Sequence, residues 1–197
     1  MDESHFGAPY YERYYLDPAT RASSDESLDR LVRFVCSYLD YLGIVPRTIL
    51  DFGCGLGRWR DALGRELPAL EYHGVEFSSY ICEAHGWARG SVVDYEHGEG
   101  VDLVVCCSVL QYLANADARA AIANLARHTD KALYLEVPTR EDWRGVCDRD
   151  RSDGDVHRRS GDWYRRELRR HFDSCGGGLF LPKHSPVALY ELERGWL

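Results

Sequence analysis

The sequence is short of lysine, of net positive charge and of long apolar runs. Of its 24 basic side chains only Lys131 and Lys183 are lysine, which indicates a GC-rich genome, and we expect a bacterial source. No apolar run reaches the ~20 residues that a transmembrane helix needs. The start, Met1–Asp2–Glu3–Ser4–His5, lacks the basic and apolar parts of a secretory signal. We therefore expect a cytoplasmic protein without membrane contact.

Basic charge and paired cysteines are scarce as well. The net charge of −8 argues against a protein that binds nucleic acid by neutralising phosphates. None of the seven cysteines forms a Cys-x-x-Cys pair, which predicts reduced thiols rather than disulfides. The spacing of the acids, histidines and cysteines near residues 147–157 matches no compact ligand pattern, so no metal is expected. At 197 residues we predict a single domain over 1–197, as a monomer or homodimer.

Short apolar runs alternate with helical patterns from residue 23 onward. A capping box of Ser23 and Glu26 precedes an apolar stripe that ends near Gly43. Helices are also predicted over 58–66, from Ser78 to about 85, and around 118–126. Predicted strands cover 48–52, 72–75, 90–93, 102–107 and 132–137. This alternation predicts a parallel sheet with helices on both faces.

The end of the chain follows a different pattern. A helix is predicted over 161–172, followed by strand-like runs at 178–181 and 187–192. The loop between these runs holds Pro182 and Pro186 and is too short for a helical crossover. The two runs should therefore form an antiparallel hairpin.

A glycine-rich turn follows the first predicted strand and leads at once into a helix. Gly53, Gly55 and Gly57 stand at alternate positions, where they let the backbone pass close to a ligand and take positive φ. Nineteen residues after Gly57 the second strand ends in Glu76, which is placed to bind ribose hydroxyls. The third glycine misses the dinucleotide-binding spacing. Asp51 before the glycines would repel a pyrophosphate but suits a cationic ligand.

In this segment the sequence resembles the class I S-adenosylmethionine-dependent methyltransferases. Asp51-Phe52-Gly53-Cys54-Gly55-Leu56-Gly57 matches their acidic-x-Gly-x-Gly-x-Gly motif, and the likeness covers 28–137 well. It implies a Rossmann-like three-layer αβα sandwich with a mainly parallel seven-stranded sheet and an antiparallel last hairpin. It also implies S-adenosylmethionine as cofactor and S-adenosylhomocysteine as product.

The resemblance assigns roles to particular residues. Glu76 matches the ribose-binding acid, Asp94 the contact to the adenine amino group, and Val93 a backbone contact to the ring. Backbone carbonyls near Cys107 and Ser108 should meet the cofactor's amino group. The N-terminal segment 1–22 either folds over the cofactor as a lid or packs the first helix against the domain. The full set of predicted cofactor-binding residues is Asp51, Gly53, Cys54, Gly55, Gly57, Glu76, Phe77, Val93, Asp94, Cys107, Ser108, Tyr11, Tyr14 and Tyr15.

Residues 139–164 are rich in polar and aromatic side chains and follow the fifth strand, so we predict that they cap the substrate. The candidate catalytic residues are His157, Asp142 and Tyr112. A solvated loop and a buried structural tyrosine are the alternatives. No general base is needed if the acceptor already ionises.

The compact length favours a small-molecule methyl acceptor. An RNA or protein methyltransferase is a second hypothesis, although Cys107–Ser108–Val109–Leu110 stands where an Asn-Pro-Pro-Tyr type sequence would be expected. A non-catalytic cofactor binder is the third hypothesis. A nicotinamide-dependent oxidoreductase is the fourth, and the glycine spacing and Asp51 argue against it. Function depends on the site rather than on the fold.

Overall fold

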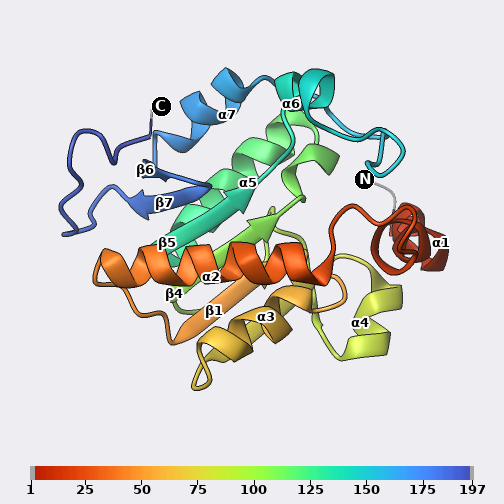
Figure 1. The fold of residues 1–197 in the computed structure, drawn as a ribbon, viewed down its shortest axis with the longest axis horizontal. Helices are drawn as coiled ribbons and strands as arrows, with labels where there is room; N and C mark the ends of the chain where they lie inside the picture. The colour runs from red at the N-terminus through yellow and green to blue at the C-terminus, as the bar shows by residue number, and fades with distance from the viewer. Residues whose placement is uncertain (1–2, 196–197) are drawn as a thin grey trace.

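The computed structural model describes residues 3–195. Its sheet has seven strands in the order β3-β2-β1-β4-β5-β7-β6 (Figure 1). Neighbouring strands are parallel from β3 to β5, whereas β7 runs antiparallel to both β5 and β6. The predicted fold class is therefore confirmed. The strands are β1 Thr48–Phe52, β2 Glu71–Glu76, β3 Ala88–Arg89, β4 Val101–Cys107, β5 Thr129–Glu136, β6 Phe172–Gly176 and β7 Leu179–Pro182.

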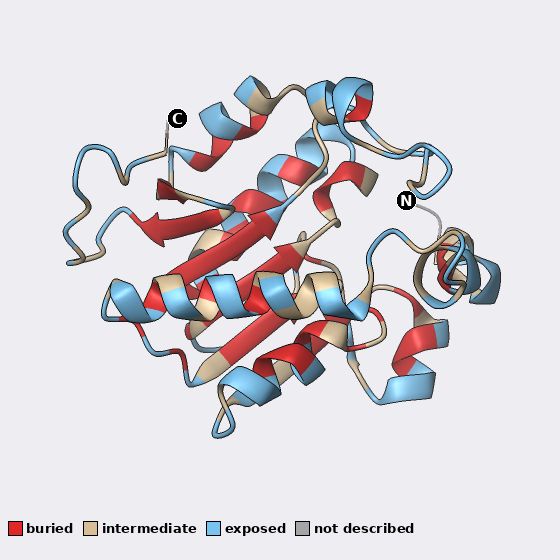
Figure 2. Ribbon diagram, viewed as in Figure 1, coloured by how far each residue is buried: buried red, intermediate tan, exposed pale blue. Residues whose placement is uncertain are grey.

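Helices cover both faces of the sheet, and alternate side chains of each central strand fill two separate cores. In β4, Leu103 and Val105 pack toward α2 and α3, while Val104 and Cys106 pack toward α5 and α7. Strands β1 and β4 in the centre are buried almost throughout (Figure 2), which is expected of parallel strands covered on both faces. The helices are α2 Asp25–Tyr41, α3 Arg58–Glu66, α4 Ser79–His85, α5 Asn115–His128, α6 Arg140–Gly145 and α7 Gly161–Leu168.

Local sequence signals explain several helix ends. The predicted bounds of α3 are confirmed, and Ser78 caps α4 by accepting a hydrogen bond from the amide of Ile81 at 3.4 Å. The predicted capping box of Ser23 and Glu26 is wrong by one residue. Ser24 is the cap, and its Oγ accepts from the amide of Ser27 at 3.1 Å.

Two strand predictions are also wrong. The third strand lies at Ala88–Arg89, and residues 92–94 form a turn. The final hairpin joins β6 to β7, whereas 187–192 forms no strand. Gly176, Gly177 and Gly178 have φ of +80°, +59° and +81°, a left-handed run that glycine adopts without steric cost, so the chain reverses there. The helix predicted over 161–172 is shorter than expected, because α7 ends at Leu168 and Phe172 begins β6.

Two segments that are far apart in sequence meet beyond the carboxyl ends of β1, β4 and β5. One is the N-terminal segment Glu3–Leu16, made of η1 Glu3–Phe6, α1 Ala8–Tyr11 and the π-helical turn η2 Glu12–Leu16. The other is the stretch between α6 and α7, which runs toward the N-terminal segment (Figure 1). His5 Nε2 of the first segment lies 2.7 Å from Asp153 Oδ2 of the second. No helix within residues 3–195 has both the length and the apolar character to cross a bilayer.

Candidate active site

A cavity of about 380 Å³ lies where the chain turns away from β1 and β4. These neighbouring strands connect onward to opposite sides of the sheet, and such a switch point is where open α/β sheets bind their ligands. Gly53 and Cys54 after β1, Cys107 and Ser108 at the end of β4, and Glu136 at the end of β5 all line it. Three adjacent strand ends therefore converge on one space.

The glycine turn has the backbone that its sequence predicts. Gly53, Gly55 and Gly57 have φ of +76°, +51° and +75°. A Cβ on Gly53 would lie 2.3 Å from Val109 Cγ2, and one on Gly57 would lie 2.7 Å from Trp87 Cζ2. Larger residues would thus be strained and would collide with these neighbours.

The backbone of Ser108, which lines the same cavity, is also in the left-handed conformation. Its φ is +56°, and within residues 3–195 it is the one non-glycine residue with positive φ. Its amide donates to the carbonyl of Glu136 at 2.8 Å, which holds the ends of β4 and β5 together. Backbone strain of this kind is concentrated at functional sites.

Asp51 is 1% exposed and lies at the end of β1, beneath the cavity rather than in its lining. Burial raises the pKa of Asp51 to about 7, although the hydroxyl of Tyr72 donates to its Oδ2 at 2.5 Å. The carboxyl group is therefore poised to change charge near neutral pH. A cationic ligand group beside it would favour the ionised form.

Glu76 at the end of β2 binds the glycine turn. Its Oε2 accepts from the amide of Gly55 at 2.9 Å, and its Oε1 accepts from the amides of Phe77 at 2.7 Å and Ser78 at 3.1 Å. The carboxylate can therefore accept further hydrogen bonds, but Glu76 is only 6% exposed.

The two residues expected to contact adenine lie away from the cavity. Asp94 is exposed in the turn after β3, and half-buried Val93 packs against the core beneath α5. Neither lines the cavity, and Phe77 does not line it either. The structure thus brings the glycine turn together with Cys107 and Ser108 around the cavity, whereas the roles predicted for Asp94 and Val93 stay predictions.

Tyrosines of the N-terminal segment cover the glycine turn. Tyr14 and Tyr15 line the cavity, whereas Tyr11 is 3% exposed. A Cβ on Gly55 would lie 3.6 Å from Tyr15 Cε1 and 3.7 Å from Tyr11 Cε1. The backbone cradle and buried acids suit a cationic nucleoside. The chain's own rings nevertheless cover the part of the cradle next to Glu76.

The three candidate catalytic residues do not converge. Tyr112 lines the cavity, with its hydroxyl 2.9 Å from that of Tyr10, and burial raises its pKa well above the ordinary value. His157 is exposed and does not line the cavity, and its backbone amide donates to the carbonyl of Gln111 at 2.8 Å. Asp142 caps α6, because its Oδ2 accepts from the amide and hydroxyl of Thr139 at 2.9 and 2.7 Å. Of the three, Tyr112 alone lines the cavity, where a catalytic residue would have to lie.

Gln111 and Glu136 are site residues whose importance emerges from the structure. Gln111 lines the cavity, is 4% exposed, and its Oε1 is buried without a hydrogen-bond partner. Buried polar atoms are nearly always paired, so Gln111 Oε1 is free to accept a further hydrogen bond. Glu136 follows directly from the strand-end rule, since it closes the strand next to β4.

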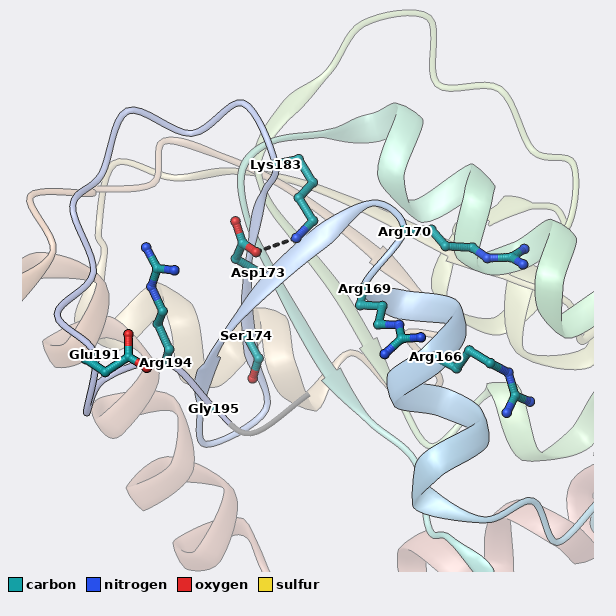
Figure 3. A pocket seen from close by; sticks show the side chains of 9 residues that line it. All are labelled: Arg166, Arg169, Arg170, Asp173, Ser174, Lys183, Glu191, Arg194 and Gly195. Carbon is teal, nitrogen blue, oxygen red and sulfur yellow. Dashed lines mark hydrogen bonds and ion pairs between the residues drawn. The ribbon is translucent and has the colours of Figure 1, made fainter.

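A second cavity, of about 700 Å³, lies at the β6 edge of the sheet (Figure 3). Lys183 pairs with Asp173 at 2.5 Å, and Arg170 pairs with buried Glu167 at 3.2 Å. The side chains of Arg166 and Arg170 extend away from Lys183 rather than toward a common point (Figure 3). This region is basic, but its cations do not form one binding centre.

Comparison with known protein families finds a match to part of the chain. Residues 50–131 match a family described as a methyltransferase domain. This segment holds the glycine turn, Glu76 and β4, and it lies within the seven-stranded fold described above. Over this segment the chain is therefore similar to methyltransferases, within a fold that solved S-adenosylmethionine-dependent methyltransferases share.

No curated protein matches the chain in sequence. Solved structures share its fold at low identity. The plantazolicin methyltransferase BpumL is 14% identical, with 92% of this chain and 83% of that chain covered and a TM-score of 0.63. Magnesium protoporphyrin IX methyltransferase from Synechocystis PCC 6803 is 16% identical, with 88% of each chain covered and a TM-score of 0.59.

A third structure is an S-adenosylmethionine-dependent methyltransferase from Clostridium acetobutylicum. It is 12% identical, with 82% of this chain and 84% of that chain covered and a TM-score of 0.60. The chain covers 53% of the length of CalS10, an amino pentose methyltransferase from Micromonospora echinaspora. That match includes 60% of this chain, at 19% identity and with a TM-score of 0.49.

Proposed function

We propose that the protein methylates a small molecule bound in the cavity beside the glycine turn. The observation that carries this proposal is the convergence of the ends of β1, β4 and β5 on one space beneath two covering segments. The cofactor in this proposal is S-adenosylmethionine, which when bound supplies an electrophilic methyl group on its sulfonium centre. The protein's task is to orient the acceptor in line with that methyl group.

The cavity walls support a small acceptor. Trp143, Asp153 and Val156 of the predicted cap 139–164 line it, as do Gln111 and Tyr112 after β4. A space of about 380 Å³ lies within the usual range of small-molecule sites. The methyltransferases named above that act on porphyrin or plantazolicin substrates also support this class of acceptor.

The acceptor should carry an O–H or N–H group. Gln111 Oε1 lacks a partner, and an acceptor that donates a hydrogen bond to it would relieve the cost of its burial. The hydroxyl of Tyr112 adds a further polar contact in the same cavity. We place Tyr112 and Gln111 in contact with the acceptor.

Radiolabelled methyl transfer from the cofactor, screened against metabolites, RNA and protein, tests the proposal. We expect labelled product from a metabolite carrying a hydroxyl or amine. Gln111→Leu should then raise KM at least tenfold, whereas His157→Asn on the exposed loop should match the wild type. Labelling of RNA or protein alone would overturn the small-molecule proposal, and cofactor binding with no transfer to any acceptor would favour a non-catalytic binder.

A further inference from the structure

The rings over the glycine turn belong to a larger aromatic cluster, which we call the aromatic plug and define as Phe6, Tyr10, Tyr11 and Tyr15. Phe6 and Tyr11 are 8% and 3% exposed, although both belong to helical turns of only four residues. The ring centroid of Phe6 lies 5.1 Å from that of Tyr10, and the centroid of Tyr11 lies 5.3 Å from that of Tyr15. The plug therefore packs as one unit.

The plug rests on residues of the cofactor site. Phe6 packs edge-on against Phe77, with centroids 6.4 Å apart, and against Tyr112, with centroids 5.1 Å apart. Tyr11 lies close enough to Glu76 for the carboxylate to raise its pKa further, beyond the effect of burial. A separation of 6.4 Å between Phe6 and Phe77 leaves no room for another ring between them, since stacked rings need about 3.5 Å on each side.

Polar contacts fix the plug to the rim of the site. Ser78 Oγ donates to the carbonyl of Phe6 at 2.7 Å, and the amide of Ser79 donates to Glu3 Oε1 at 2.6 Å. Glu3 also pairs with Arg89 at 2.5 Å. These partners follow β2 directly or lie in β3. The N-terminal segment is thus attached to the same strand ends that an adenosine would use.

The plug and a bound adenosine would need the same space beside Glu76 and Gly55. A ribose bound by Glu76 must reach a carboxylate that Tyr11 and the surrounding backbone now enclose. Gly55 lacks a side chain, which lets a ligand approach, but the rings of Tyr11 and Tyr15 lie so close over it that an added Cβ would be in van der Waals contact with both. We infer that the aromatic plug occupies the adenosine side of the cofactor site and must leave before the cofactor binds there.

This inference rests on S-adenosylmethionine as cofactor and does not depend on the acceptor. It differs from a lid, which closes over a bound cofactor and gains contacts from it. A plug lowers the apparent affinity for the cofactor in proportion to the fraction of molecules in which the site is open. The short helical turns of the segment suit such opening, because few backbone hydrogen bonds must break.

Amide hydrogen exchange with and without S-adenosylhomocysteine separates plug from lid. We expect saturation with S-adenosylhomocysteine to speed exchange in residues 7–16 at least tenfold, while amides of the glycine turn become more protected. Slower or unchanged exchange in residues 7–16 would overturn the inference.

Binding kinetics provide the second measurement. Phe6→Ala removes the central ring of the plug, and Glu3→Ala removes its attachment to Ser79 and Arg89 without leaving a cavity. Stopped-flow binding of S-adenosylhomocysteine should show association at least tenfold faster for Phe6→Ala and about threefold faster for Glu3→Ala. Leu16→Ala is the matched control, since Leu16 is in the same segment but 53% exposed, and it should match the wild type.

Weaker or slower binding by both plug variants would indicate a lid and overturn the inference, as would rates unchanged from the wild type. If no variant bound S-adenosylhomocysteine, the cofactor assignment would fail along with the inference. If binding accelerated as expected but no small molecule accepted a methyl group, only the proposed function would fail.

Discussion

Two of the cavities lie in different parts of the sheet, and the larger of the two is the poorer candidate. The basic cavity at the β6 edge measures about 700 Å³, compared with about 380 Å³ for the one beside the glycine turn. Its cations are exposed and mostly paired, and they extend in different directions (Figure 3). At the smaller cavity, the backbone of Ser108 is strained, the Oε1 atom of Gln111 has no hydrogen-bond partner, and the carboxyl group of Asp51 is buried beneath. Unmet interactions and stored strain therefore identify the site better than volume or net charge.

The sharpest test of this contrast removes charge from each cavity in turn. Asp51→Asn should weaken S-adenosylhomocysteine binding about 100-fold or more, because losing one partner of a buried charge pair costs about 3–5 kcal/mol. The double variant of Arg169→Ala and Arg194→Ala should change that affinity less than twofold. Isothermal titration calorimetry measures both. Equal losses from the two cavities would remove the distinction drawn between them.

A glycine pair tests the backbone of the smaller site. Gly53→Ala should lower the free energy of unfolding by about 1–3 kcal/mol, since φ is +76° and the added Cβ meets Val109. Gly64→Ala is the matched control, because Gly64 is exposed within α3 and has open space around it. This control should raise the same free energy by about 0.5–1 kcal/mol. Urea denaturation gives both values, and a stable Gly53→Ala would show that the turn tolerates a side chain.

The pH dependence of binding reports on Asp51. Its pKa of about 7 means that the ionised form is lost as pH falls below neutrality. Affinity for S-adenosylhomocysteine should therefore fall roughly tenfold per unit below that pKa, and this dependence should vanish in Asp51→Asn. A flat profile in the wild type would exclude a charge-dependent role for Asp51.

The same carboxyl affects the stability of the free protein with the opposite sign. Because its pKa is higher in the folded state than in the unfolded chain, folding takes up a proton between pH ~4 and 7. This group's contribution to stability is therefore largest at low pH and declines as pH rises toward 7. Comparing the unfolding free energies of wild type and Asp51→Asn across that range isolates the contribution.

The smallest expected effect belongs to the basic region. Glu167 is buried and pairs with Arg170 at 3.2 Å and Arg119 at 3.4 Å, yet both arginines are largely exposed. Glu167→Gln should lower the unfolding free energy by about 1 kcal/mol and leave S-adenosylhomocysteine binding unchanged. Asp162→Asn, which breaks the exposed pair with Arg165, is the control and should have no measurable effect on stability. A change in binding for Glu167→Gln would link the two regions.

The sequence predicted the parts of the site that depend on local rules. Glycines at alternate positions after an apolar strand indicated the turn, and Ser78 indicated the start of α4. The Thr139-x-x-Asp142 spacing also matches a capping box, so the role of Asp142 at the start of α6 was open to prediction from a local pattern. Treating Asp142 as a free base overlooked that pattern.

The remaining features depend on contacts between distant residues. His5 and Asp153 are 148 positions apart, and nothing in either segment indicates that they meet. The covering of Gly55 by Tyr11 and Tyr15 likewise arises from tertiary packing. The β6 strand was missed because polar and glycine residues interrupt its apolar pattern, while its last residue Gly176 and the two glycines that follow determine where the hairpin turns.

The left-handed backbone of Ser108 limits which residues this position can accept during divergence. Glycine, asparagine and aspartate reach that conformation at little cost, whereas valine and isoleucine do so only with severe crowding. A β-branched residue there would pull apart the ends of β4 and β5 that its amide connects. Position 108 can therefore vary in hydrogen-bonding character while its bulk stays small.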